Sequence, residues 1–162
     1  MQSLLSGDII LLKNSFDPNY LDELKNIFRK KFENSTSTFH KIYEECPNFY
    51  RNITPDLASK YSFHQVKKTY YLFPWNKKYE PDLFNFYEKI YRKWRLLKYL
   101  SGLQSNAWEN NTLKDGIIDR FQVVNYPAGS GEQELHQDPY LYQKFFISIY
   151  LSEKNKDFSS VG

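Results

Sequence analysis

The last third of the chain alternates strand patterns with turn signals, and this order limits the possible folds more than any other feature. It reads IIDRFQVVNYP, AGSGE, QELHQDP, and then QKFFISIYLS. Alternating apolar and polar residues predict strands over 117–127, 133–139 and 143–152. Gly129 and Gly131 predict a tight reversal that lays the second of these strands beside the first.

Two amphipathic helices are predicted upstream. Asp17 followed by Pro18 is an N-cap signal, and apolar residues at helical spacing predict a helix over 18–33. The second helix begins at Pro81 and ends near Ser101-Gly102, where glycine can terminate it.

Short apolar runs at 7–14 and 66–73 predict two further strands, whereas 34–65 is mixed and predicts no element. The expected fold is α+β, with one domain over residues 1–162. A helical N-terminal part, 1–116, precedes the strands of 117–162.

Composition restricts the class of protein. Hydrophobic residues make up 41% of the 162 residues, which is enough for a core. The 14 Tyr and 13 Phe suit a β-rich protein with an aromatic-lined cavity, and they suit an ordinary aromatic core almost as well. The net charge of +3 is too small to imply a polyanionic partner.

Cys46 is the single cysteine, which excludes an intrachain disulfide and a cysteine-based zinc cluster. The first residues lack the pattern of a signal peptide, and no segment reaches the ~18–20 apolar residues that span a bilayer. We therefore expect a cytoplasmic protein with no membrane partner.

His136 and Asp138 are the first candidate site residues. On a strand, residues i and i+2 point to the same side, about 6–7 Å apart at Cα, so both side chains could reach one metal ion. Imidazole and carboxylate suit ferrous iron, as in the triad of two histidines and one carboxylate. The alternative is that two polar residues alternate on a solvated strand.

The preceding strand supports the first interpretation. Its period of two places Arg120, Gln122 and Tyr126 on one face, together with Ile118 and Val124. Large polar side chains in a strand rich in Val, Ile and Phe indicate a polar cavity. The other interpretation is that this face of the strand is simply exposed to solvent.

The ordered set RFQVVNYPAGSGEQELHQDPY, then FFISIYLSEKNKDFSSVG, resembles the first metal-binding half of the iron(II)- and 2-oxoglutarate-dependent oxygenases. The prolyl-hydroxylase-like and phytanoyl-hydroxylase-like branches are the most similar. The shared features are a strand ending in Tyr, a glycine turn, His-x-Asp, a strand ending in Tyr-Leu, and a later acidic, aromatic and glycine segment. The resemblance covers about residues 117–162.

The resemblance implies a double-stranded β-helix of the jelly-roll or cupin type, in which His136 and Asp138 hold Fe(II). Tyr126 would bind the carboxylate of the cosubstrate 2-oxoglutarate, and Arg120 and Gln122 would line the same pocket. With dioxygen, such an enzyme hydroxylates a C–H bond of a small-molecule or peptidyl substrate. A carboxylate at Asp138 favours hydroxylation, because the related halogenases carry a small residue there.

The chain departs from this family after Asp138, where the second histidine and the following Arg or Lys for the distal carboxylate are missing. His40 and His64 lie upstream and are poor candidates for the third ligand. The expectation is a fragment of a longer enzyme, inactive alone, whose uncovered half barrel would favour association. A complete but incompetent protein is the alternative.

Two other functions remain open. A catalytically inactive β-helix protein could bind a small molecule in the same pocket. A nucleic-acid-binding module, the less favoured alternative, would use the basic and aromatic residues of EKIYRKWRLLKYL. On a helix, those cations more simply form one face that is exposed to solvent.

Tyr140 and Tyr142 could line a substrate entrance, and packing explains them equally well.

Overall fold

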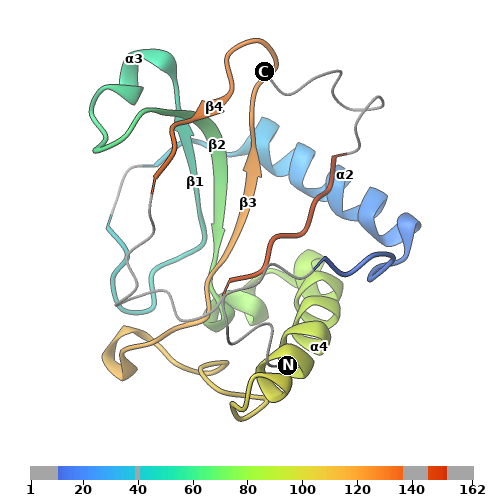
Figure 1. The fold of residues 1–162 in the computed structure, drawn as a ribbon. Helices are drawn as coiled ribbons and strands as arrows, with labels where there is room; N and C mark the ends of the chain where they lie inside the picture. The colour runs from blue at the N-terminus through green and yellow to red at the C-terminus, as the bar shows by residue number, and fades with distance from the viewer. Residues whose placement is uncertain (1–10, 39–40, 137–145, 153–162) are drawn as a thin grey trace.

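The protein is an α+β structure with a small antiparallel sheet, seen in a computed structural model that describes residues 11–38, 41–136 and 146–152 (Figure 1). The helices and strands, in chain order, are α2 (Pro18–Asn34), β1 (Phe49–Ile53), α3 (Pro55–Ala58), β2 (Gln65–Leu72), α4 (Phe84–Leu100), β3 (Phe121–Asn125) and β4 (Glu132–Gln133). Short 3-10 turns are η1 (Pro74–Tyr79), η2 (Pro81–Leu83) and η3 (Leu113–Asp115).

Both long helices predicted from the sequence are confirmed. The Asp17 carboxylate accepts the backbone N–H groups of Asn19 at 2.9 Å and Tyr20 at 3.3 Å, which caps α2 as expected. The second predicted helix begins with η2 and continues as α4. It ends at Leu100 with Ser101 as its C-cap, and Gly102 follows with φ +81°, a backbone conformation that favours glycine.

Strand β2 is the centre of the sheet. Strand β1 pairs with one edge of β2, from Phe49 opposite Tyr71 to Ile53 opposite Lys67. The other edge pairs with β3 and then with β4 (Figure 1). The predicted strand at 66–73 is therefore confirmed, and it carries the pairing of every other strand.

The predicted reversal between 117–127 and 133–139 is wrong. Strand β3 runs antiparallel to β2 as far as Asn125 opposite Lys68, and β4 continues along the same edge with Glu132 opposite Val66. The residues between them form a compact loop in which Gly131 N–H donates to the Pro127 carbonyl at 2.7 Å. A Cβ on Gly131 would lie 2.6 Å from the Pro127 nitrogen, so the loop requires glycine there.

Other strand boundaries also need correction. β3 covers only part of 117–127, and His136 is not in a strand, so the i, i+2 geometry expected for it does not apply. Residues 11–14 and 146–152 also form no strand, although Ile149 and Leu151 pack against the core. The sheet starts before residue 117, because β1 and β2 precede it.

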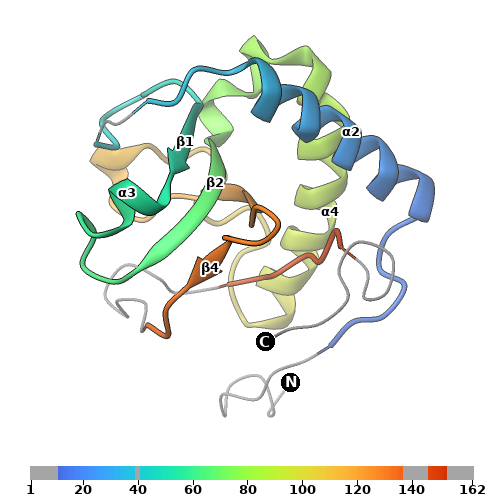
Figure 2. The same cartoon turned by 90° about the horizontal axis from the view of Figure 1, so that it is seen from above.

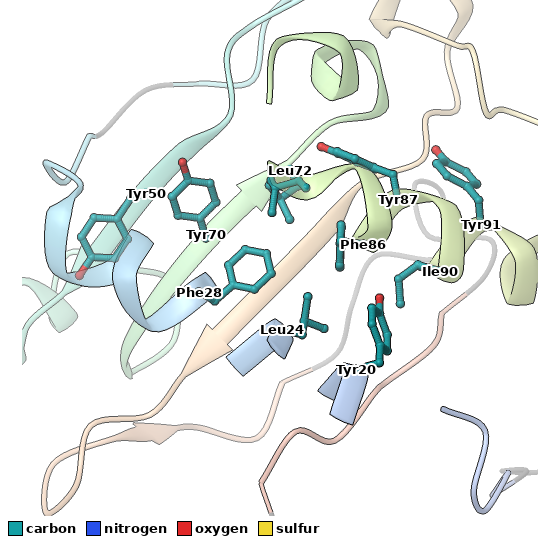
Figure 3. Packing of buried hydrophobic residues seen from close by; sticks show 11 residues of the cluster. Tyr20, Leu24, Phe28, Tyr50, Tyr70, Leu72, Phe86, Tyr87, Ile90 and Tyr91 are labelled. Atoms are coloured by element: carbon teal, nitrogen blue, oxygen red, sulfur yellow. The ribbon is translucent and has the colours of Figure 1, made fainter. Parts of the chain in front are cut away.

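The main core lies between the sheet and the two long helices. Both helices cover the same face of the sheet (Figure 2), and the buried aromatic side chains interlock there (Figure 3). Phe28 of α2 contacts Tyr70 of β2 and Phe86 of α4 edge-on, with ring centroids 6.1 and 5.7 Å apart. Such contacts hold both helices against one side of β2, and residues on the other side of the strand lie outside this core.

No helix in the described ranges is both long and apolar enough to span a membrane.

A buried ion pair attaches β3 to α4. Lys98 Nζ lies 2.7 Å from Asp119 Oδ2, and the two residues are 0% and 4% exposed. Lys98 also donates to the Ala107 carbonyl, and the Trp94 indole donates to Asp119 at 3.1 Å. Because Asp119 directly precedes Arg120 and β3, this cluster sets where β3 meets the helix layer.

We expect Lys98→Met to lower the free energy of unfolding by about 3–5 kcal/mol, because it leaves the Asp119 charge buried without its cation. Adding Asp119→Asn should recover about 0.5–3 kcal/mol of this loss. Urea unfolding measures both, with the exposed Arg92→Met on the same helix as a control that stays within about 0.5 kcal/mol. Additive losses in the double variant would contradict the pairing.

Candidate functional site

The face of the sheet away from α2 and α4 carries most of the candidate residues. Tyr50, Tyr70 and Leu72 point to the helices, and Phe121 and Val123 pack against the same core. The register therefore turns the intervening residues to the other side. We call this the polar face and define it by Arg51, Lys67, Thr69, Gln122, Tyr126 and Gln133.

His136 lies at the β4 end of the polar face. Its ring stacks on Phe63, with centroids 4.5 Å apart and an interplanar angle of 4°. Its Nδ1 is 3.0 Å from the Glu134 carbonyl, which can only accept, so the neutral ring carries its proton on Nδ1. The lone pair is then on Nε2; the Gln133 amide nitrogen lies 3.0 Å from Nε2 and 3.2 Å from Nδ1. Metal-binding histidines commonly use this arrangement.

Gln133 joins His136 to the sheet. Its side-chain oxygen accepts the Tyr126 hydroxyl at 2.7 Å and the Lys67 ammonium at 2.9 Å, while its amide nitrogen faces His136. Tyr126 is 48% exposed, and partial burial raises its pKa, so the hydroxyl stays protonated and able to donate at neutral pH. Tyr126 and His136, two of the residues predicted from the sequence, thus belong to one hydrogen-bonded chain.

His64 has a different role. Its ring contacts Glu132 at 2.7 Å, and its backbone N–H donates to the Glu134 carboxylate at 2.7 Å. The Glu134 N–H returns a hydrogen bond to the His64 carbonyl at 2.8 Å. These contacts hold β4 against β2, so His64 supports the site as part of the scaffold.

Arg120 and Gln122 lie at the far end of the same side of the sheet. With the Gln122 amide oxygen turned toward Arg120, the guanidinium donates to it at 2.9 and 3.2 Å. The guanidinium carbon is also 5.8 Å from the Tyr71 ring centroid. Tyr71 is four residues from Lys67, about 13 Å along an extended strand, so this pair is not gathered around His136.

Asp138 lies outside the described residues, as do His40, Tyr140 and Tyr142. Within the described ranges, no group of three or more His, Cys, Asp or Glu residues could hold a metal ion. The described part of the candidate iron site therefore consists of His136 alone.

Four of the five cations of α4 make contacts in the structure. Lys98 pairs with Asp119 and Arg95 with Glu109, whose pKa is held below its usual range by the hydrogen bond from Arg95. Lys89 and Lys93 lie over aromatic rings of the α2 region, with Nζ 4.2 and 5.9 Å from the ring centroids. These contacts favour a structural role for the segment over a nucleic-acid surface.

Four residues of the polar face were missed by the sequence analysis: Gln133, Arg51, Lys67 and Thr69. The signal for the last two is in QVKKTYYL, because residues at a spacing of two from Gln65 are all polar or polar-tipped. Lys68 next to Lys67 obscures that alternation. Arg51 lies in a region where no element was predicted.

The chain matches no protein-family model, no curated protein and no solved structure. The resemblance of residues 117–162 to the oxygenases thus depends on the sequence motifs themselves.

The stacking of His136 on Phe63 has a direct magnetic signature. Protons held over the face of an aromatic ring are shielded, so we expect the His136 ring protons upfield of their values in an unfolded peptide. Phe63→Leu should move these signals downfield and leave those of His64 nearly unchanged in proton NMR spectra. Unshifted His136 signals in the folded wild-type protein would contradict this placement.

Proposed function

We propose that the protein is a non-haem Fe(II)/2-oxoglutarate-dependent dioxygenase of the hydroxylase type. In this proposal the sheet is the first part of a double-stranded β-helix, and a small-molecule or peptidyl substrate is hydroxylated at a C–H bond. Iron with 2-oxoglutarate and dioxygen would supply the oxidising power, giving succinate and CO2 as co-products. The third ligand is not assigned within this sequence.

The observation that carries the proposal is the hydrogen-bonded chain from Tyr126 through Gln133 to His136. Of the residues expected for the cosubstrate and for iron, Tyr126 and His136 were selected from motifs ten positions apart, and both contact Gln133. An exposed strand with incidental polar residues has no need of such a connection. A polar face opposite a helix-covered face also suits the inside of a β-helix.

The described residues fit an iron site in part. The His136 tautomer leaves Nε2 for a metal and uses Nδ1–H to fix the ring on a backbone carbonyl. Binding through Nε2 requires the Gln133 amide to turn away, and Asp138 would be the carboxylate ligand. Tyr126, held protonated, would then donate its hydroxyl hydrogen bond to a carboxylate of the cosubstrate.

We expect anaerobic Fe(II) titration of the natural gene product to give a weak visible charge-transfer band when 2-oxoglutarate is added. His136→Ala and Asp138→Ala should each abolish the band, because each removes one of the few iron ligands. His64→Gln is the matched control and should retain it.

A folded natural product without any iron-dependent band would overturn the oxygenase proposal. If that product still bound a small molecule on the polar face, the protein would instead be a catalytically inactive binding protein, the alternative function given above.

A further inference from the structure

The segment 146–152 has the side-chain pattern of a strand, although the structure forms no strand there. Ile149 and Leu151 are partly buried and pack against the main core. The even-numbered residues of the segment are all exposed, with Phe146 and Tyr150 at 70% and 79%. This period of two is typical of a strand that lies with one face on a core.

The backbone of the segment is unpaired within the described part of the chain. No backbone hydrogen bond joins 146–152 to another described residue, and Figure 1 draws the segment in red, outside the sheet. A segment that is anchored on a core through alternate side chains, with its N–H and C=O groups unpaired, can accept a further strand. Its edge therefore offers a docking surface for an extended chain.

The composition of the segment determines which partner fits. Its sequence, FISIYLS, includes no charge, proline or glycine, although 25% of the residues of the chain are charged. Aromatic and β-branched residues favour strand pairing, and an uncharged strand pairs best with another that brings no charge to it. A second copy of 146–152 meets this requirement, because neither strand then places a charge opposite the apolar side chains of the other.

Two copies also match each other residue by residue when they run antiparallel about a two-fold axis at Ser148. Phe146 of each copy then lies directly opposite Tyr150 of the other. In the same register, Ile147 lies opposite Ile149. Pairs of aromatic and of β-branched side chains are those that stabilise antiparallel strands. A shift that moves the axis to Ile149 would put both aromatic rings opposite serines.

The two-fold arrangement is closed. Each copy uses the same edge, so the assembly is complete with two chains, whereas parallel, in-register stacking would continue without end. Antiparallel pairing through this edge therefore gives a dimer and not a filament.

We propose that the protein forms a homodimer through antiparallel pairing of 146–152 with the same segment of a second copy. Ile149 and Leu151 of each copy stay on their own core, and the Phe146–Tyr150 pairs form on the outer face of the joined strands. The inference does not depend on the proposed oxygenase activity, because it uses no residue of the candidate site.

Sedimentation velocity of the full chain is the first test. Over roughly 1 µM to 1 mM, the range suited to a small interface, the mass should rise from one chain to two and no further. Ser148→Lys should weaken the dimer by about fivefold or more, because it places two like charges directly opposite each other at the axis.

Ser59→Lys is the matched control for the added charge. Ser59 is exposed and follows α3, which lies away from the red segment in both views (Figures 1 and 2). This variant should dimerise within about twofold of wild type.

Disulfide trapping tests the register. Ser148→Cys places two thiols opposite each other at the axis, where Cα atoms about 4.5–5.5 Å apart allow a disulfide, so oxidation should link the two chains. Ser152→Cys is the control, since its thiols would lie about 26 Å apart along the paired strands and should remain unlinked. Cys46 is buried and is common to both variants.

A wild-type chain that stays monomeric over this range would overturn the proposal, as would growth beyond a dimer. A dimer of unchanged affinity in folded Ser148→Lys, or one that forms no disulfide in Ser148→Cys, would reject this surface as the interface. If Ser148→Lys does not fold, as circular dichroism would reveal, the two cysteine variants decide the matter.

The outcomes also separate the dimer from the proposed function. An iron-dependent band in a protein that stays monomeric supports the oxygenase and rejects the dimer. A dimer linked through Ser148→Cys that gives no such band supports the dimer and rejects the oxygenase.

Discussion

The structure depends on the two-sided character of β2, the one strand that pairs with all the others. Its alternate residues separate two environments: Tyr70 and Leu72 face the aromatic core under α2 and α4, and Lys67 and Thr69 face away. A slip of one residue in register would exchange the two sets and place Thr69 or Tyr71 where Tyr70 now packs under the helices. The core that stabilises the helices therefore also fixes which polar side chains share the other face.

The position of β3 against β2 is fixed at both ends. Before the strand, the buried Lys98–Asp119 pair ties the chain to α4. After it, the loop that requires Gly131 returns the chain to the same edge of β2, where contacts with His64 hold β4. Gln133 reaches Tyr126 because the chain leaves that edge and returns to it. The candidate site is thus a product of long-range pairing.

Local signals in the sequence predicted both long helices and β2 correctly, whereas the apolar runs at 11–14 and 146–152 form no strand. The Asp17 cap, the apolar spacing of both helices and the run of β2 depend on neighbours within a few residues, so they could be read directly. The continuation of β3 by β4 depends on pairing with a strand about sixty residues earlier, and a glycine turn alone favoured a hairpin. Tyr126 and His136 were predicted from motifs, whereas Lys67 became visible only when the register showed which side it faces.

The central proposal is that a metal site lies on the polar face, at His136. Paramagnetic broadening of amide NMR signals by Mn²⁺, which accepts the same oxygen and nitrogen ligands as Fe(II), locates such a site directly. The account predicts broadening centred on Gln133 and His136 that extends to Tyr126 and Lys67, with the signals of α2 remaining sharp. Broadening centred elsewhere, such as at Glu80 and Asp82, whose carboxylates both contact the Lys31 ammonium, or none at all, would contradict it.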